Sequence, residues 1–173
     1  MAFPLSRFLD VADGIQPNQF TVGSHETLKS LDDLEPIYKK LLDEPVAAVL
    51  AVVGNDGRAN ITPMWFDYSG DTVLLNVAAH RKKTEWIRKN PQLTFLLVNP
   101  ANAYHWVQIR CTVANEIHED DPDIGHRAAE QVDKIFTKYT GNPPPYGLRD
   151  PSMNERRILF ECPVERVAVF GKP

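Results

Sequence analysis

The sequence predicts a mainly β protein of the α+β class, a small barrel of short antiparallel strands with helical insertions. Three observations support this fold class. Short apolar stretches are separated by tight turns rich in Gly, Asn and Asp. Other stretches carry apolar residues at helical spacing. With 173 residues, of which 43% are hydrophobic and 24% charged, the chain has the size and composition of one globular domain.

Charge and cysteine content exclude several classes of protein. Nineteen Lys and Arg against 23 Asp and Glu give a net charge of −4, whereas domains that bind nucleic acid usually carry a basic excess. Cys111 and Cys162 are too few for a disulfide framework or a four-cysteine zinc site. The first 20 residues lack a signal-peptide core, and the longest apolar run, 46–53, is too short to span a bilayer. We therefore expect a reduced, cytoplasmic protein that binds neither nucleic acid nor membranes.

The N-terminal region, residues 1–30, has no sustained periodicity and is interrupted by Pro and Gly. We expect it to be an irregular arm that lies on the surface or on a partner subunit, followed by a single domain over 31–173. The first helix of that domain is predicted over 34–43, because its apolar side chains fall on one stripe and Pro45 follows it.

A meander of three strands follows the first helix. The apolar run 46–53 ends at a Gly-Asn-Asp-Gly turn, in which Gly57 favours left-handed backbone angles. The second strand is predicted over 58–68, with Pro63 marking a bulge or an unpaired edge position. A Ser-Gly-Asp turn then leads into the third strand, 72–78.

The rest of the domain alternates between helices and strands. Helices are predicted over 80–90 and 121–139, where apolar residues recur at helical spacing. The Pro-rich segment 141–147 is expected to be a stiff extended loop. The remaining predicted strands are 93–98, 104–117, 156–162 and 165–170.

The first candidate site is the junction where the strand 72–78 is followed by a helix. Free backbone N–H groups and the helix dipole at such a junction attract anions. Arg81 and Lys83 add a guanidinium and an ammonium at the same place, which suits a phosphate. A solvated basic helix face explains these residues equally well, since Arg88 and Lys89 follow.

The second candidate site lies one hairpin upstream, in 60–66. Thr62 is expected to face the same cleft as the phosphate junction, because the two strands are neighbours. Pro63, Met64 and Trp65 then form a wall that suits a planar heterocycle. Ordinary core packing is the alternative, and the residues alone favour it.

Three aromatic residues open the strand 104–117. Tyr104 and Trp106 are expected on one face and His105 on the other, so that two rings border a ligand or fill a dimer interface. The acidic run 118–121 is interpreted as a solvated loop, and no metal site is expected there. Motifs for dinucleotides, P-loop nucleotides, zinc proteases and serine hydrolases are absent from the sequence.

The order and spacing of several segments resemble the pyridoxamine 5′-phosphate oxidase-like split β-barrel flavoproteins. The matching pieces are Asp56-Gly57, Thr62-Pro63 with Phe66, Arg81-x-Lys83 and Asn90-Pro91. Three later segments are similar to the branch of that family that uses the deazaflavin coenzyme F420. They are 98–110, 138–141 with the Pro-rich loop after it, and 156–159. The resemblance covers about residues 34–170.

The resemblance implies a split barrel that forms a homodimer, with two flavin-type sites at the subunit interface. The cofactor-binding residues that it implies are Arg81, Lys83, Thr62, Pro63, Met64, Trp65, Asn76, Val77, Ala78 and Trp106. Among these, Arg81 and Lys83 would hold the cofactor phosphate, 76–78 would add phosphate contacts, and 62–65 would run along the tricyclic ring.

The expected activity is hydride transfer between F420 and a small, electron-poor organic substrate, with the chemistry supplied by the cofactor. Two alternatives stay open: an FMN-dependent oxidase or reductase on the same barrel, and a non-enzymatic carrier of flavin or haem. The oligoglutamate tail of F420 calls for further cations, and the candidates are Arg110, Lys138 and Arg149. No catalytic residue is assigned, and the candidates for a general acid are Tyr104, His105 and Tyr146.

Overall fold

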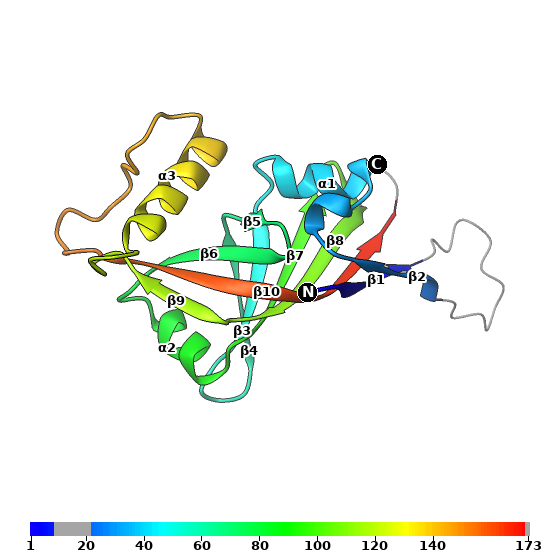
Figure 1. Ribbon diagram of the computed structural model, residues 1–173, viewed down its shortest axis with the longest axis horizontal. Helices are drawn as coiled ribbons and strands as arrows, with labels where there is room; N and C mark the ends of the chain where they lie inside the picture. The colour runs from blue at the N-terminus through cyan, green and yellow to red at the C-terminus, as the bar shows by residue number, and fades with distance from the viewer. Residues whose placement is uncertain (9–21, 172–173) are drawn as a thin grey trace.

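The computed structural model describes residues 1–8 and 22–171, and Figure 1 shows how its elements are arranged. The strands of this described part are β1 (Phe3–Phe8), β2 (Val22–Leu28), β3 (Ala48–Val53), β4 (Ala59–Met64), β5 (Asp67–Ser69), β6 (Thr72–Ala78), β7 (Gln92–Asn99), β8 (Asn102–Thr112), β9 (Asn115–His118) and β10 (Arg157–Phe170). The helices are α1 (Pro36–Asp43), α2 (Lys82–Lys89) and α3 (His126–Thr140), with a short 3₁₀ turn at Leu31–Asp33. No helix in these residues is both long and apolar enough to cross a membrane.

One long strand, β10, holds the two halves of the barrel together. Its first half pairs with β6 and its second half with β8, and the register shifts between Val164 and Arg166. From β8 the sheet continues through β7 and β3 to β4. Trp65 and Phe66 then lead the chain from β4 into β5, which pairs with β6. These pairings close the barrel except beside β4, whose second edge has no strand partner in the described chain.

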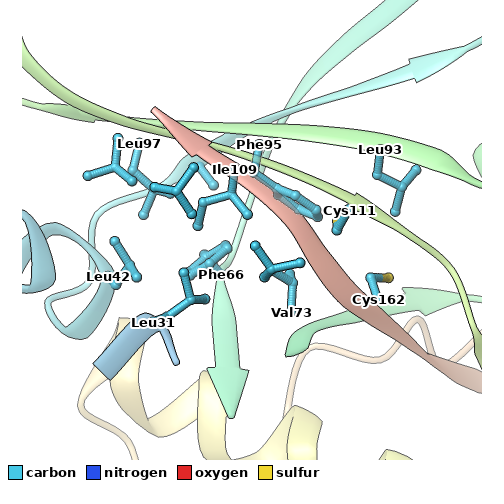
Figure 2. Close-up of a cluster of buried hydrophobic side chains, with 14 of the residues drawn as sticks. Leu31, Leu42, Phe66, Val73, Leu93, Phe95, Leu97, Ile109, Cys111 and Cys162 are labelled. Atoms are coloured by element: carbon cyan, nitrogen blue, oxygen red, sulfur yellow. The ribbon is translucent and has the colours of Figure 1, made fainter. Parts of the chain in front are cut away.

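The core fills the space between the two halves. Along β3, Ala48, Leu50 and Val52 are buried, because alternate side chains of a strand point to the same face. Phe66 from the β4–β5 link packs edge to face on Phe95 of β7, with ring centroids 5.6 Å apart (Figure 2). Such a contact contributes about 0.5–1.5 kcal/mol beyond the burial of the rings.

A second, smaller apolar cluster lies under α3, which sits at the end of the molecule opposite β1 and β2 (Figure 1). Ile117 of β9, Leu159 of β10 and Ala128 of α3 form this cluster, and Leu74 of β6 packs against it. α3 therefore lies on the outer side of the β6–β10 pair, next to the point where the barrel is open.

The predicted fold class is confirmed, but the predicted irregularity of residues 1–30 is wrong. β1 pairs antiparallel with β2 and parallel with β10, where Leu5 is opposite Val167. The buried side chains of Phe3 and Leu5 join the core. This pairing is between segments far apart in the sequence, so the local pattern, interrupted by Pro4, does not indicate it. Residues 9–21 of the predicted arm lie outside the described residues.

Three predicted strand boundaries are also wrong. The predicted strand 104–117 is two strands, β8 and β9, with a break at 113–114. Conversely, 156–162 and 165–170 form one strand, because β10 continues through the register shift. The predicted strand 58–68 is divided into β4 and β5 where the chain turns from one sheet to the other.

Candidate functional site

The barrel opening beside β4 brings the two predicted site segments together. α2 begins directly after β6, and its second residue, Lys83, reaches across the opening to β4. The Lys83 Nζ donates to Thr62 Oγ1 at 2.9 Å and lies 3.2 Å from Met64 Sδ. The predicted neighbourhood of Thr62 and the strand-to-helix junction is therefore present in the structure.

The electrostatics of this junction favour an anion. Burial lowers the pKa of the Lys83 ammonium, and the positive charge of Arg81 lowers it further. Within residues 1–8 and 22–171, neither side chain has a carboxylate as hydrogen-bond or ion-pair partner. The exposed Asp150 has a lowered pKa, chiefly through hydrogen bonds from Ser152 and to a small extent through Arg81. Two cations held together without a carboxylate partner favour a bound anion over a solvated helix face.

The residues at the end of β6 are engaged inside the chain. Asn76 is buried, and its amide donates to the Ala128 carbonyl at 2.9 Å while its Oδ1 accepts from Arg157 Nε at 2.7 Å. Val77 belongs to the core cluster. The Ala78 carbonyl accepts from the backbone N–H of Arg81 at 3.0 Å and so fixes the start of α2. A phosphate contact by 76–78 stays a prediction, and Asn76 has little capacity left for one.

A cavity of about 350 Å³ continues from Met64 along the opening. Its lining consists of Ala47, Pro63, Met64, Trp65, Asn76, Val132, Ile135, Tyr146 and Arg157. The wall is mostly apolar, with the indole of Trp65 stacked on Tyr139 of α3 at a centroid distance of 5.3 Å and an interplanar angle of 11°. The residues Pro63, Met64 and Trp65 thus line a cavity, and their contact with a planar ring stays a prediction.

Arg157 forms the polar end of this cavity. Its guanidinium donates to Glu155 Oε1 at 2.8 Å as well as to Asn76, and it lies 5.3 Å from the centroid of the Tyr146 ring. Tyr146 is fixed in turn by its backbone N–H, which donates to Asp133 Oδ1 at 2.6 Å. Arg157 was not among the predicted site residues, although it lies at the start of the predicted strand 156–162, where a strand end can contribute to a site.

Trp106 lies away from this cavity, on the outer face of the sheet. Its ring stacks on Phe170 at a centroid distance of 5.8 Å and contacts Phe8 at the same distance. The predicted alternation is confirmed, because Tyr104 is 73% exposed whereas His105 is buried. Within this chain, Trp106 is not brought together with the residues of the opening.

The candidates for a general acid have different surroundings. His105 packs against Tyr38, its Nδ1 lies 3.0 Å from Asn99 Nδ2, and burial lowers its pKa. His105 is a core residue, and Tyr104 points to solvent. Tyr146 is the one candidate of the three that lines the cavity at the opening.

The cations predicted for an anionic tail are mostly engaged elsewhere. Lys138 donates to the carbonyls of Leu42 and Phe66 at 2.6 and 3.0 Å. Arg149 forms an ion pair with Glu119. Arg110 is exposed on β8. Among the described residues, no group of three or more His, Cys, Asp and Glu side chains is placed to hold a metal.

Comparison with known proteins agrees with this architecture. The family model described as pyridoxamine 5′-phosphate oxidase matches residues 34–170.

Among solved structures, a protein named F420 reductase is 22% identical with a TM-score of 0.61, over 78% of this chain and 98% of that one. A putative pyridoxamine 5′-phosphate oxidase from Listeria innocua is 21% identical with a TM-score of 0.52, over 75% and 92% of the two chains. The haem storage protein HutZ from Vibrio cholerae is 15% identical with a TM-score of 0.57, over 80% and 96%. No curated protein matches the sequence. At these identities the structural similarity supports the fold alone.

Proposed function

The chain belongs to the pyridoxamine 5′-phosphate oxidase family, and from this premise we propose that it is an oxidoreductase that binds a flavin-type cofactor in the barrel opening. The cofactor that we propose is the deazaflavin F420, used for hydride transfer with a small organic substrate. The observation that carries the proposal is the cation pair of Arg81 and Lys83, which lacks a carboxylate partner in the described chain and adjoins an apolar cavity.

The residues at the opening fit such a cofactor in two ways. A phosphate would place a negative charge next to the positive charges of Arg81 and Lys83. It would thereby offset the unfavourable effect of burial on the charged form of Lys83. The apolar cavity beyond Met64 would bind a planar ring by hydrophobic contact, because its mostly apolar wall offers water few hydrogen-bond partners. Thr62 would hold the Lys83 ammonium in place between these two regions.

The bound cofactor would supply the two-electron chemistry. The protein's part is placement of the cofactor and exclusion of water, for which the Trp65 ring stacks on Tyr139 at the edge of the cavity. Arg157 is the cationic donor of the cavity, and its charge is balanced by Glu155, whose side chain is 6% exposed. This balanced pair favours a neutral oxygen acceptor over a carboxylate at that end of the cavity.

Two arguments bear on the choice between F420 and FMN. Both carry a phosphate, so Arg81 and Lys83 do not discriminate between them. The resemblance of 98–110 and 138–141 to the F420 branch supports F420. FMN in the same opening is the alternative, and the titration below separates the two.

A homodimer is part of this proposal. The outer face of the sheet carries apolar side chains that a single chain leaves uncovered, namely Val49, Ala51, Ile61, Leu96, Val98 and Trp106. Ile61 is 63% exposed. A second copy of the chain would cover this face, since closed symmetric dimers bury the same patch on both subunits.

The decisive experiment is a titration of the purified protein with F420 and with FMN, preceded by its absorption spectrum. We expect saturable binding of F420 that is tighter than binding of FMN, and oxidation of the reduced cofactor by electron-poor substrates. Tight FMN binding without measurable F420 binding would reverse the choice of cofactor. Cofactor retained without any turnover would instead support a carrier.

A further inference from the structure

The inner face of β4 passes three different regions in order. Met64, Thr62 and Asn60 share this face, because they pair with the buried residues Ala48, Leu50 and Val52 of β3. Met64 lines the apolar cavity and Thr62 contacts Lys83. Asn60 lines a second cavity of about 460 Å³. Two residues of a strand advance about 6.6 Å, so this second cavity begins one such step beyond the cation pair.

The second cavity lies between the β3–β4 hairpin and α2. Its lining consists of Gly54, Asn55, Asp56, Arg58, Ala59, Asn60, Lys82 and Trp86. We propose that this hairpin cavity binds a carboxylate-bearing tail that continues from the cofactor phosphate, such as the oligoglutamate chain of the deazaflavin. This inference rests on the proposed function and assigns the tail to Arg58 and Lys82, in place of the predicted Arg110, Lys138 and Arg149.

The charges of the hairpin cavity support an anionic occupant. Arg58 is 88% exposed, and its contact with Asp56 is long, at 3.9 Å. The Asp56 carboxylate is engaged by the backbone N–H of Arg58, at 3.1 Å. Lys82 lies over the Trp86 ring at 5.9 Å and has no carboxylate partner in the described chain. Lys89, which is not part of the lining, donates to Asn55 Oδ1 of the same hairpin at 3.0 Å. The cavity lining therefore carries more positive than negative side chains, whereas the whole chain has a net charge of −4, and this local excess favours an anionic ligand.

A polar atom beside the cavity also lacks a partner. The Trp86 Nε1 is buried and has no hydrogen-bond partner among residues 1–8 and 22–171. Gly54 lies against this indole, because a Cβ there would be 4.0 Å from Trp86 Cε2 and 3.1 Å from Asp56 Oδ1. Because this nitrogen has almost no solvent-accessible surface, the indole offers a bound tail its ring as a wall, and the tail's contacts with donors come from Arg58 and Lys82.

The position of the cavity also selects among phosphate-bearing ligands. FMN ends at its phosphate, so it would occupy the opening as far as Lys83 and leave the hairpin cavity alone. A tail of linked carboxylates extends farther and offers several anions to Arg58 and Lys82 in turn. A dinucleotide such as FAD could also extend this far, and it is therefore included as a separate probe.

The test compares the doubly substituted protein Arg58→Gln/Lys82→Gln with the wild type. The charge-matched control is Lys29→Gln/Lys40→Gln, which removes two exposed cations that line neither cavity. The probes are F420 with its oligoglutamate tail, the same deazaflavin without glutamates, FMN and FAD. Dissociation constants are measured at low and high salt, and thermal unfolding of each apo protein verifies that the fold is intact.

We expect the wild type to bind the tailed deazaflavin about three- to tenfold more tightly than the tail-free form, the range for two exposed ion pairs. The Arg58→Gln/Lys82→Gln protein should lose this preference, bind FMN as the wild type does, and show a weaker salt dependence. The charge-preserving change Arg58→Lys/Lys82→Arg should restore most of the preference, which a purely structural effect would not do.

Three outcomes would overturn the proposal. Equal wild-type affinity for tailed and tail-free deazaflavin would refute the tail site while leaving the proposed function intact. A preference for FAD over FMN that the double substitution removes would show a nucleotide in the cavity instead. If no probe binds, the proposed function fails, and the tail site fails with it.

Discussion

Replacing Lys83 with methionine tests the anion site most directly, because the change removes the charge and keeps an unbranched chain. In the wild type, Lys83 donates to the neutral oxygen of Thr62 and lies against the sulfur of Met64, so that no carboxylate balances its charge. A charge-assisted hydrogen bond to a phosphate contributes about 1.5–3 kcal/mol. Lys83→Met should therefore weaken binding of either FMN or F420 by about ten- to a hundredfold.

The same substitution should have the opposite effect on the protein without cofactor. The folded state lowers the pKa of Lys83, so the protonated side chain destabilises the fold at neutral pH. This penalty is relieved as the pH rises through the folded pKa towards the unfolded value, about 10.5. We expect the apo Lys83→Met protein to unfold at an equal or higher temperature than the wild type at pH 7, with the difference shrinking at high pH.

Fluorescence titration with both cofactors and thermal unfolding of the apo proteins measure the two effects. Arg81→Ala should weaken binding to a similar extent, and Arg81→Lys should recover part of the loss, because an ammonium lacks the two-pronged geometry of a guanidinium. Lys29→Ala removes a charge from an exposed position outside the opening and serves as the control. Small, equal losses in all of these proteins would show that the residues form a basic helix face.

Three further predictions concern the core, the interface and the thiols. Burial lowers the pKa of His105, so protonation of the unfolded chain should lower the unfolding temperature by a few °C as the pH falls from 7 to 5, and His105→Gln should flatten this dependence. Ile61→Arg should convert the proposed dimer to a monomer in light scattering and weaken cofactor binding; a wild-type monomer at micromolar concentration would refute the proposed dimer and its shared site. Cys111 and Cys162 are free and buried, and the pKa of Cys111 is raised by its hydrogen bond with Cys162 and by burial, so a disulfide reagent should label neither thiol until the protein unfolds.

The local elements of the meander and the cation pair were accessible from the sequence because their signals are short-range. The turn glycine Gly57 has a φ of 77°, as the hairpin prediction requires, and 72–78 forms the predicted strand. Arg81 is the N-cap residue of α2, with extended backbone, and Lys83 is the second helical residue, so the local pattern of a strand followed by a helix places both cations at the helix start. Thr62 was expected near them because 58–68 and 72–78 were predicted to be neighbouring strands. The 2.9 Å contact confirms the proximity, but the reason was wrong, because β4 does not pair with β6 and the Lys83 side chain spans the space between them.

The features that were missed depend on contacts between distant segments. Arg157 enters the cavity because β10 pairs with β6, which places Ala78 opposite Arg157. That register also aligns the guanidinium with Asn76, which nothing in the local sequence indicates. Trp106 lies on the outer face with Phe170, so within one chain it does not reach the opening, and its contact with the cofactor stays a prediction that depends on a second subunit. Local periodicity predicts which face of a strand is buried but does not say which strand lies next to it.

Pro63 connects the sequence pattern to the proposed function. A proline cannot donate a backbone hydrogen bond, which confines it to edges and bulges of a sheet. β4 is indeed the edge strand beyond β3, and its free edge faces the opening where Lys83, the apolar cavity and the hairpin cavity meet. A residue other than proline at position 63 would have a backbone N–H, and a strand that paired with this second edge of β4 would close the barrel and leave no room beside Thr62. The same strand therefore supplies the ring wall, holds the cation of the anion site and lines the hairpin cavity, because it is left unpaired on one side.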